Sequence, residues 1–265
     1  MIRLLQELDR KSVLEYLYKD LNYNIFPIGD IEAFGFDDPI QSIYGEFDES
    51  GQYISIFLRY RGNGIYYSHM NHFNKEYLDI FAKEHFNYIS GKSELMDLIK
   101  PYLEGFSGDR TYFCRASSLN SDNIKHDSSI KEVKTEQECE RLYDLLSQID
   151  EFGINKQTKE DFVKGKMLSA NKMGITLYIE EDHKIVATVA TTAETTKNAM
   201  VVAVATNQDY RNKGYATKLL VALMDLYINQ KKKELCLFYN NPKAGKIYLQ
   251  LGFEYIGTWD MYKKI

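Results

Sequence analysis

The chain has 265 residues, of which 44% are hydrophobic, and a formal net charge of -5. This is enough for a sizeable core in one or two domains, and the acidic balance argues against a general nucleic-acid binder, whose footprint is strongly basic. The charged N-terminus is not of signal-peptide type, and no stretch approaches the ~18 apolar residues of a membrane span. We therefore expect a cytoplasmic protein without a membrane partner.

The first half of the chain predicts a helix, three meandering strands, and then helix, strand, helix and strand. The predicted helices cover 11–19, 75–84 and 93–103, and the predicted strands cover 41–48, 52–60, 64–70, 85–91 and 111–117. The segment 26–36 is rich in aromatic and acidic residues, which favours core packing, with binding of a cationic acceptor as the alternative.

The polar stretch 117–129 contains few apolar residues and predicts a linker between two domains, 1–120 and 128–265. In the second domain Thr135 is the expected N-cap of a helix in which Leu142, Leu145 and Leu146 recur at helical spacing. The predicted helices cover 135–150, 156–170, 215–228 and 242–251, and the predicted strands cover 129–135, 175–181, 184–193, 199–206, 234–239, 253–259 and 261–265.

The two halves therefore share one order of elements. This predicts an α+β fold, an α/β sandwich whose mixed, mostly antiparallel sheet is flanked by helices in two tandem lobes. A diverged internal duplication explains the shared order, and two unrelated α+β halves are the alternative.

The stretch TNQDYRNKGYATKLL, residues 206–220, joins a predicted strand to a predicted helix. The first N–H groups of a helix have no intrahelical partner, and the helix dipole adds positive charge at the same end. Gly214 lets a phosphate approach the backbone, and Arg211 and Lys213 add cations at the rim. The pattern suits a pyrophosphate, although it is neither a P-loop nor a dinucleotide fingerprint. An ordinary strand–helix turn with two solvated cations is the alternative.

Together with the segment YNNPKAGKIYLQLGFEYIG, residues 239–257, this loop resembles the GNAT superfamily of acyl-CoA-dependent N-acetyltransferases. The loop from Arg211 to Ala216 fits the family pattern Gln/Arg-x-x-Gly-x-Gly/Ala. Asn241, followed seven residues later by Tyr248 and then by Gly252-Phe253, fits its second motif. The resemblance covers about 128–265. The first half lacks such a loop, so we expect it to be a degenerate GNAT-like lobe that walls the acceptor groove.

The resemblance implies acetyl-CoA as cosubstrate and a primary amine of a small molecule or a protein as acceptor. It implies that loop amides hold the CoA pyrophosphate, that the preceding strand end pairs with the pantetheine arm, and that Asn241 binds the arm or a site water. Capping of the helix that begins at Pro242 is a second role for Asn241. The implied cofactor-binding residues are Val204, Ala205, Thr206, Arg211, Asn212, Lys213, Gly214, Tyr215, Ala216, Thr217 and Asn241.

The implied reaction is attack of an amine on a thioester. Tyr248 matches the family's proton donor to the leaving thiolate, with ordinary packing as the alternative, and a strand amide near Val204 is the candidate oxyanion donor. The general base stays open: Glu180, Glu181 and Glu194 are expected to be solvated hairpin charges. A water chain or a residue of the first half could serve instead.

Two other functions stay open. Many members of the family use a Glu on the central strands as base, but Val201 to Ala205 contains no carboxylate, which favours a non-catalytic module that senses acyl-CoA. A two-lobed transferase using aminoacyl-tRNA would need a basic groove, which the acidic balance does not favour. Three widely spaced cysteines fit no zinc or disulfide pattern, and His69, His72 and His85 form no metal motif, so we expect reduced thiols and no metal. We expect a monomer or a homodimer that binds no nucleic acid.

Overall fold

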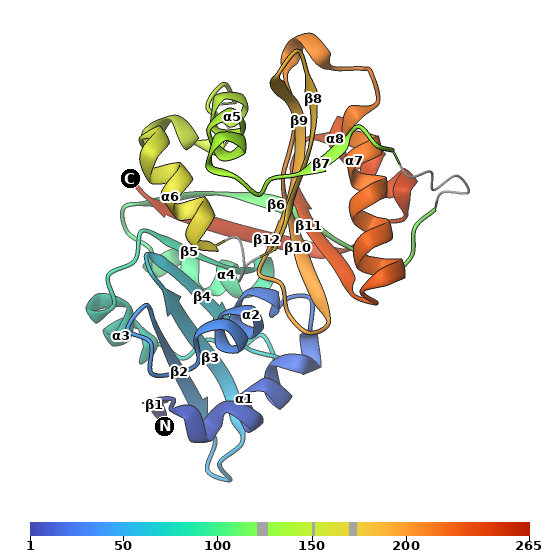
Figure 1. Cartoon of the computed structure of the whole chain (residues 1–265). Helices are drawn as coiled ribbons and strands as arrows, with labels where there is room; N and C mark the ends of the chain where they lie inside the picture. Colours follow the sequence, from blue (N-terminus) through green and yellow to red (C-terminus); the bar gives the residue numbers. More distant parts are fainter. Residues whose placement is uncertain (121–126, 150–151, 170–173) are drawn as a thin grey trace. The chain divides into compact units, whose positions relative to one another are not determined.

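The structure, a computed structural model, describes residues 1–120, 127–149, 152–169 and 174–265 (Figure 1). Two compact units can be distinguished. The first lobe comprises Met1–Phe113, Phe238–Asn240 and Tyr255–Ile265, and the second lobe comprises Cys114–Leu237 and Asn241–Glu254. In the described part of the chain, no helix has the length and apolar character needed to traverse a bilayer.

The two halves of the chain repeat one order: strand, two helices, three strands, helix, strand, helix, strand. The first half contains β1 (Ile2–Leu4), α1 (Arg10–Leu17), α2 (Ile25–Phe34), β2 (Gln41–Phe47), β3 (Tyr53–Tyr60), β4 (Asn63–Tyr67), α3 (Tyr77–Lys83), β5 (Tyr88–Lys92), α4 (Ser93–Ile99) and β6 (Phe106–Ala116). The second contains β7 (Ile130–Glu132), α5 (Glu136–Leu146), α6 (Lys159–Ser169), β8 (Thr176–Glu181), β9 (Lys184–Thr192), β10 (Asn198–Thr206), α7 (Tyr215–Met224), β11 (Glu234–Tyr239), α8 (Pro242–Leu251) and β12 (Glu254–Lys264).

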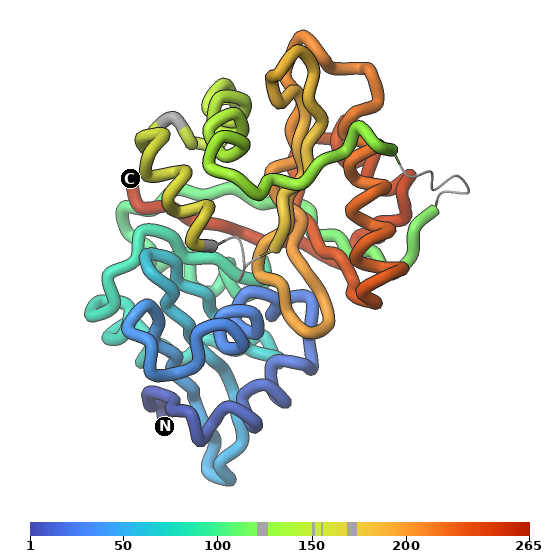
Figure 2. The backbone as a smooth tube through the Cα atoms, viewed as in Figure 1, coloured from blue at the N-terminus to red at the C-terminus, as the bar shows by residue number. Residues whose placement is uncertain are grey.

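The C-terminal segment corrects one prediction. Instead of two strands, 253–259 and 261–265, the chain forms the single strand β12, which pairs antiparallel with β5 and belongs largely to the first lobe (Figure 2). From the sequence, the charged residue Asp260 predicts an interruption between two strands. Its carboxylate is buried, however, and accepts hydrogen bonds from Ser93 at 2.5 Å and Arg110 at 2.9 Å. The satisfied charge lets the strand continue.

Helix α2 lies in the segment 26–36, for which the sequence predicts packing but no helix. Pro27 stands in the first turn, where the backbone N–H has no intrahelical partner, so the proline does not break the helix. The predicted core packing is confirmed, because Ile25, Ile28 and Ile31 are buried. Asp30 is buried beside them, and desolvation raises its carboxyl pKa to about 7.

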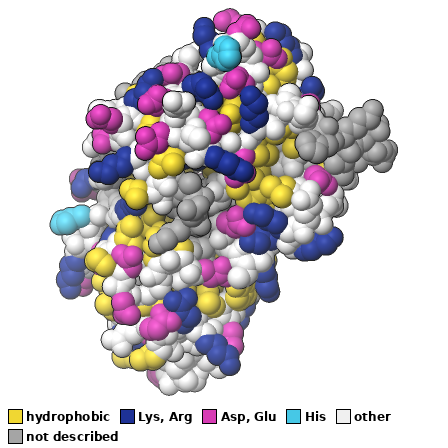
Figure 3. Space-filling model, viewed as in Figure 1, with side chains coloured by type: hydrophobic (Ala, Val, Ile, Leu, Met, Phe, Trp, Pro, Cys, Tyr) yellow, Lys and Arg dark blue, Asp and Glu magenta, His cyan; other side chains and the backbone are white. Residues whose placement is uncertain are grey.

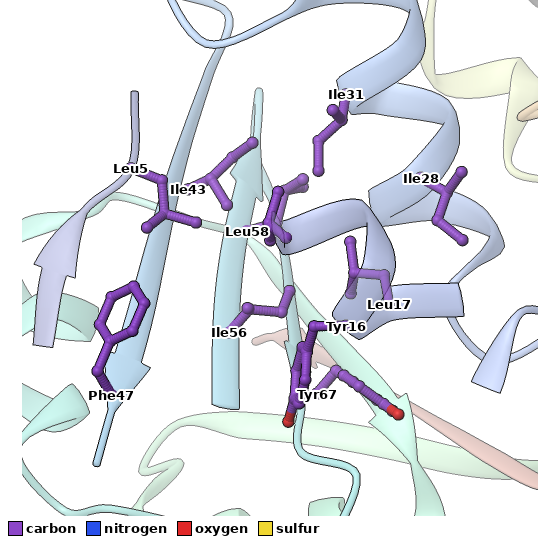
Figure 4. Close-up of a cluster of buried hydrophobic side chains, with 11 residues drawn as sticks. Leu5, Tyr16, Leu17, Ile28, Ile31, Ile43, Phe47, Ile56, Leu58 and Tyr67 are labelled. Atoms are coloured by element: carbon purple, nitrogen blue, oxygen red, sulfur yellow. The ribbon is translucent and has the colours of Figure 1, made fainter. Parts of the chain in front are cut away.

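On the surface, basic and acidic side chains are interspersed over the face seen in Figure 3. Inside the first lobe, whose strands run in the order β1-β2-β3-β4-β5-β12-β6, apolar side chains of α1, α2 and the first strands interdigitate (Figure 4). Tyr16, Leu17, Ile28, Ile56 and Leu58 belong to this core.

In the second lobe the strands run in the order β7-β8-β9-β10-β11, with α5 and α6 on one side of β8–β10 and α7 on the other (Figure 1). The predicted N-cap is confirmed: Thr135 accepts from the amide of Glu138, whose carboxylate accepts from the amide of Thr135. The hairpin between β8 and β9 is also as predicted, and its two central residues, Asp182 and His183, have positive φ.

Some predicted segments differ at their ends. The helix predicted over 215–228 is α-helical only to Met224 and continues as a π-helical turn over Asp225–Gln230. Within the predicted linker, 121–126 lie outside the described residues, as do 150 and 170 at the ends of two predicted helices.

Candidate functional site

Strand β10 is distorted and only partly paired. Its register with β9 shifts between Val202 and Ala205, where Ala203 has φ +51°. Its parallel pairing with β11 covers only Asn198 to Met200. A bulge of this kind leaves ladder groups unpaired and redirects side chains. The C-terminal end of β10 therefore presents main-chain groups next to a gap between the two strands.

Helix α7 begins just after this strand end. Gly214 is its N-cap, with φ +79°, a left-handed conformation that glycine adopts without steric cost. A Cβ placed there would meet no protein atom within 4 Å, so the space in front of the helix start is open. The N–H groups of Tyr215, Ala216 and Thr217 belong to the first turn and lack intrahelical acceptors, which makes this end a suitable anion site.

Helix α8 supplies the other wall. Its N-cap Asn241 accepts a hydrogen bond from the amide of Lys243 at 2.9 Å, and Pro242 is the first helical residue, so the predicted capping role is confirmed. At the other end Gly252 has φ +109°, and a Cβ there would lie 2.9 Å from the carbonyl oxygen of Ser118. The Gly252-Phe253 motif thus ends the helix.

Tyr248 faces inward from α8. Its side chain is 7% exposed and packs edge-on against Phe253, with ring centroids 6.0 Å apart. Burial raises the pKa of the phenol to about 12, so Tyr248 keeps its proton at neutral pH.

These elements enclose a cavity of about 510 Å³ within the second lobe. All the residues predicted for the site except Lys213 line it: Val204, Ala205, Thr206, Arg211, Asn212, Gly214, Tyr215, Ala216, Thr217, Asn241 and Tyr248. The ammonium of Lys213 lies over the ring of Tyr210, 4.6 Å from its centroid. The guanidinium of Arg211 donates to the carbonyl of Thr206 at 3.4 Å.

Sequence reasoning missed several lining residues, among them Ile149, Phe152, Tyr210 and Ile247. Ile247 could have been found, because it shares a helical face with Ala244 and Tyr248. Ile149 and Phe152 follow α5 and are brought to the cavity by tertiary packing. Nothing in the local pattern indicates that position.

The structure corrects the expectation of a solvated hairpin carboxylate for Glu180 and Glu194, and confirms it for Glu181, which is exposed. Glu194 is 19% exposed and accepts from Tyr227 at 2.7 Å and Lys233 at 2.8 Å. Burial alone would raise its pKa, but these hydrogen bonds hold the pKa below its usual value. Glu180 is 15% exposed beside Arg141, and Glu181 accepts from the hydroxyl of Tyr215 at 2.7 Å. None of the three lines the cavity.

Cys114, Cys139 and Cys236 are buried free thiols. Among the described residues, no group of three or more His, Cys, Asp or Glu side chains is arranged to hold a metal ion.

The comparisons agree with this geometry. Residues 139–253 match the family described as "Acetyltransferase (GNAT) family". This segment is therefore a GNAT-family domain, and it contains most of α5, all of α6, α7 and α8, and the bulged strand. No curated protein matches the chain.

Solved structures extend the likeness to the whole fold. A GCN5-related N-acetyltransferase-like protein from Streptococcus suis has a TM-score of 0.58 at 16% identity, covering 97% of this chain and 99% of that one. An acetyltransferase of the GNAT family from Colwellia psychrerythraea has 0.57 at 15%, with both chains fully covered. A tandem GNAT protein of the clavulanic acid pathway has 0.61 at 10%, covering 99% and 97%. Both halves of the chain thus follow the tandem GNAT fold.

Proposed function

We propose that the second lobe is an acetyl-CoA-dependent N-acetyltransferase that acetylates a primary amine of a small molecule or a protein. The observation that carries this proposal is the cavity itself. It joins the bare amides around Gly214, the end of β10 beyond its pairing with β11, and the buried phenol of Tyr248 in one space.

The residues present suit the cosubstrate. A pyrophosphate needs backbone donors without a side chain in front of them, and the open space at Gly214 meets that need. Arg211 and Lys243 add positive charge to the lining. The extended backbone of Val204 to Thr206 offers hydrogen-bonding groups to an amide-containing arm. When bound, acetyl-CoA supplies an acetyl group activated as a thioester.

The chain's own groups then have distinct tasks. In this proposal the amide of Val204, beside the bulge, stabilises negative charge on a carbonyl oxygen. Tyr248 holds a proton on its phenol oxygen that a departing thiolate can accept. The predominantly apolar walls formed by Ile149, Phe152 and Ile247 exclude water around these groups.

One observation favours a non-catalytic acyl-CoA sensor instead. Among the described residues lining the cavity there is no Asp, Glu or His, so no evident base removes the amine proton.

Two measurements separate these functions. Calorimetric titration with acetyl-CoA tests binding, and release of CoA with a panel of amines tests turnover. Binding with amine-dependent CoA release supports the enzyme, and binding without it supports the sensor. Absence of binding contradicts both.

A further inference from the structure

A second cavity, of about 250 Å³, lies next to α5 and α6 and is bordered by residues of β7 to β10. Its floor can be read from the strand register. Thr176 is paired with Ala190, and Ala190 is paired with Val202. Directly paired residues of antiparallel strands point to the same face, so these three side chains form one row across the sheet. The small side chain of Ala190 leaves room between the other two.

The direction of this row follows from Tyr178. Residues two apart on a strand share a face, so Thr176 points to the same side as Tyr178. The hydroxyl of Tyr178 donates to Glu138 of α5 at 2.8 Å. The row therefore faces α5 and α6, whose residues Cys139, Lys166 and Met167 also line the cavity.

The hydroxyl of Thr176 indicates that the cavity binds a ligand. The residue is 3% exposed, and in the described structure its Oγ1 atom is buried with no hydrogen-bond partner. A buried hydroxyl without a partner costs stability, and proteins keep such groups mainly where they serve a function. Here the residue borders a cavity, so a bound polar group could accept its hydrogen bond.

The charged side chains in the lining indicate which kind of ligand the cavity would bind. Lys166 places an ammonium group in the lining, and burial lowers the pKa of that group. Glu132 is the acidic lining residue among those described, and its carboxylate pairs with Lys134 at 3.0 Å. An anion in the cavity would favour the charged form of Lys166 and accept from Thr176. Cys139, Met167 and Val202 contribute apolar parts of the wall, and Thr191 and Thr192 also line it.

The spacing of the strands sets the distance between the amine and the anion of the acceptor. Val202 lies two residues before Val204, at the bulge where the acetyl group would arrive, whereas Thr176 lies two strands away. Two strand spacings are about 9.5 Å and two residues along a strand are about 6.6 Å, so the two positions are about 11.5 Å apart. Hydrogen bonding at one end and attack at the other each take up about 3 Å. The amine and the anion of an acceptor must then be separated by several bonds.

We propose that this cavity binds the carboxylate of the acceptor through Thr176 and Lys166, and that the acceptor is an ω-amino acid with a short methylene chain. The inference rests on the proposed acetyltransferase function and names the acceptor class for it.

Matched pairs of amines test the proposal in the full chain. The pairs are β-alanine with ethylamine, 4-aminobutyrate with propylamine and 5-aminopentanoate with butylamine. We expect kcat/KM to be at least about tenfold higher for the acid in one or more pairs, the range of a charge-assisted hydrogen bond. In Thr176→Val and Lys166→Met that ratio is expected to fall towards one.

The control is Lys164→Met, which removes an exposed lysine of the same helix and should keep the ratio. Thr176→Val should also raise the urea concentration of half-unfolding, because it removes an unpartnered hydroxyl. Equal rates within every pair, or ratios unchanged in both variants, would overturn the proposal even though amines are acetylated.

If no amine is turned over, the proposed acetyltransferase function is wrong. The carboxylate site in the second cavity is then tested by ligand binding alone. NMR titration with 4-aminobutyrate and with butanoate then serves as the readout. Binding that weakens in both cavity variants and not in Lys164→Met supports the carboxylate site, and absence of binding overturns it.

Discussion

The two halves of the chain share one order of elements but use the corner between the fourth strand and the third helix differently. In the second lobe β10 bulges at Ala203, and Gly214 opens the start of α7 to a cavity. In the first lobe the register of β3 with β4 is unbroken, and the corner is filled by aromatic rings. The ring of Tyr66 lies 5.1 Å from that of Tyr77 and 5.4 Å from that of Phe73.

This difference shows how little is needed to separate a packed corner from an open one. One extra residue in a strand and one glycine at a helix start expose main-chain groups. In the first lobe, large side chains at the corresponding corner bury the main-chain groups instead. The first lobe therefore has a packed core where the second has a cavity, and its lack of cofactor binding stays a prediction. Its predicted role as a wall of the acceptor groove stays a prediction.

The largest effect is expected from emptying the aromatic corner. Tyr77 is fully buried, and Tyr77→Ala should lower the free energy of unfolding by about 3–5 kcal/mol, through lost burial and a residual cavity. Urea unfolding measures this, with the exposed Tyr255→Ala as control. Acetyl-CoA affinity should not change, and a clear change would mean that the first lobe takes part in cofactor binding.

The next effect concerns chemistry in the second lobe. Tyr248→Phe removes the phenol proton and keeps the ring, so kcat should fall about 100- to 1000-fold, while the Kd for acetyl-CoA stays within about threefold. Steady-state CoA release and calorimetry measure the two quantities. Tyr112→Phe, at an exposed tyrosine, is the control. Full activity in Tyr248→Phe would assign Tyr248 to packing alone.

A pair of glycines separates backbone strain from binding. Gly214 and Gly51 have φ of +79° and +81°, and neither would place a Cβ within 4 Å of another atom. Valine at either position should cost about 1–2 kcal/mol of stability. Only Gly214→Val should also weaken acetyl-CoA binding, by about 10- to 100-fold, because its side chain enters the space before the helix start. Equal affinity in both variants would contradict the pyrophosphate site.

The smallest effect depends on pH. The link between β9 and β10 carries Glu194, whereas the corresponding link in the first lobe, Arg61-Gly62, has no carboxylate. The lowered pKa of Glu194 means that its stabilising contribution is present above its unfolded-state pKa, near 4.5, and is lost as pH falls through the folded pKa. The difference in unfolding free energy between wild type and Glu194→Gln should therefore shrink from pH 7 to acid pH. A difference that does not vary with pH would refute this.

Local patterns predicted much of the second lobe. The cap at Thr135, the hairpin at Asp182-His183 and the turn at Gly214 depend on residues close in sequence, so their chemistry is visible in a single segment. The same holds for the α8 motif from Asn241 to Gly252. The short loops and helical spacings therefore indicated both the fold and the elements that line the first cavity.

Tertiary contacts decided the rest. The single strand β12 exists because Asp260 finds Ser93 and Arg110, which lie far away in sequence. The bulge at Ala203 depends on the partners of β10, and the row from Thr176 to Val202 depends on the register of three strands. Each of these features is stabilised by contacts between residues that are far apart in sequence, so no short segment of the sequence predicts it. The sequence by itself thus predicted a helix N-terminus suited to a diphosphate. The second cavity and its unpartnered hydroxyl depend on the pairing of strands that are distant in sequence, so only the tertiary structure shows them.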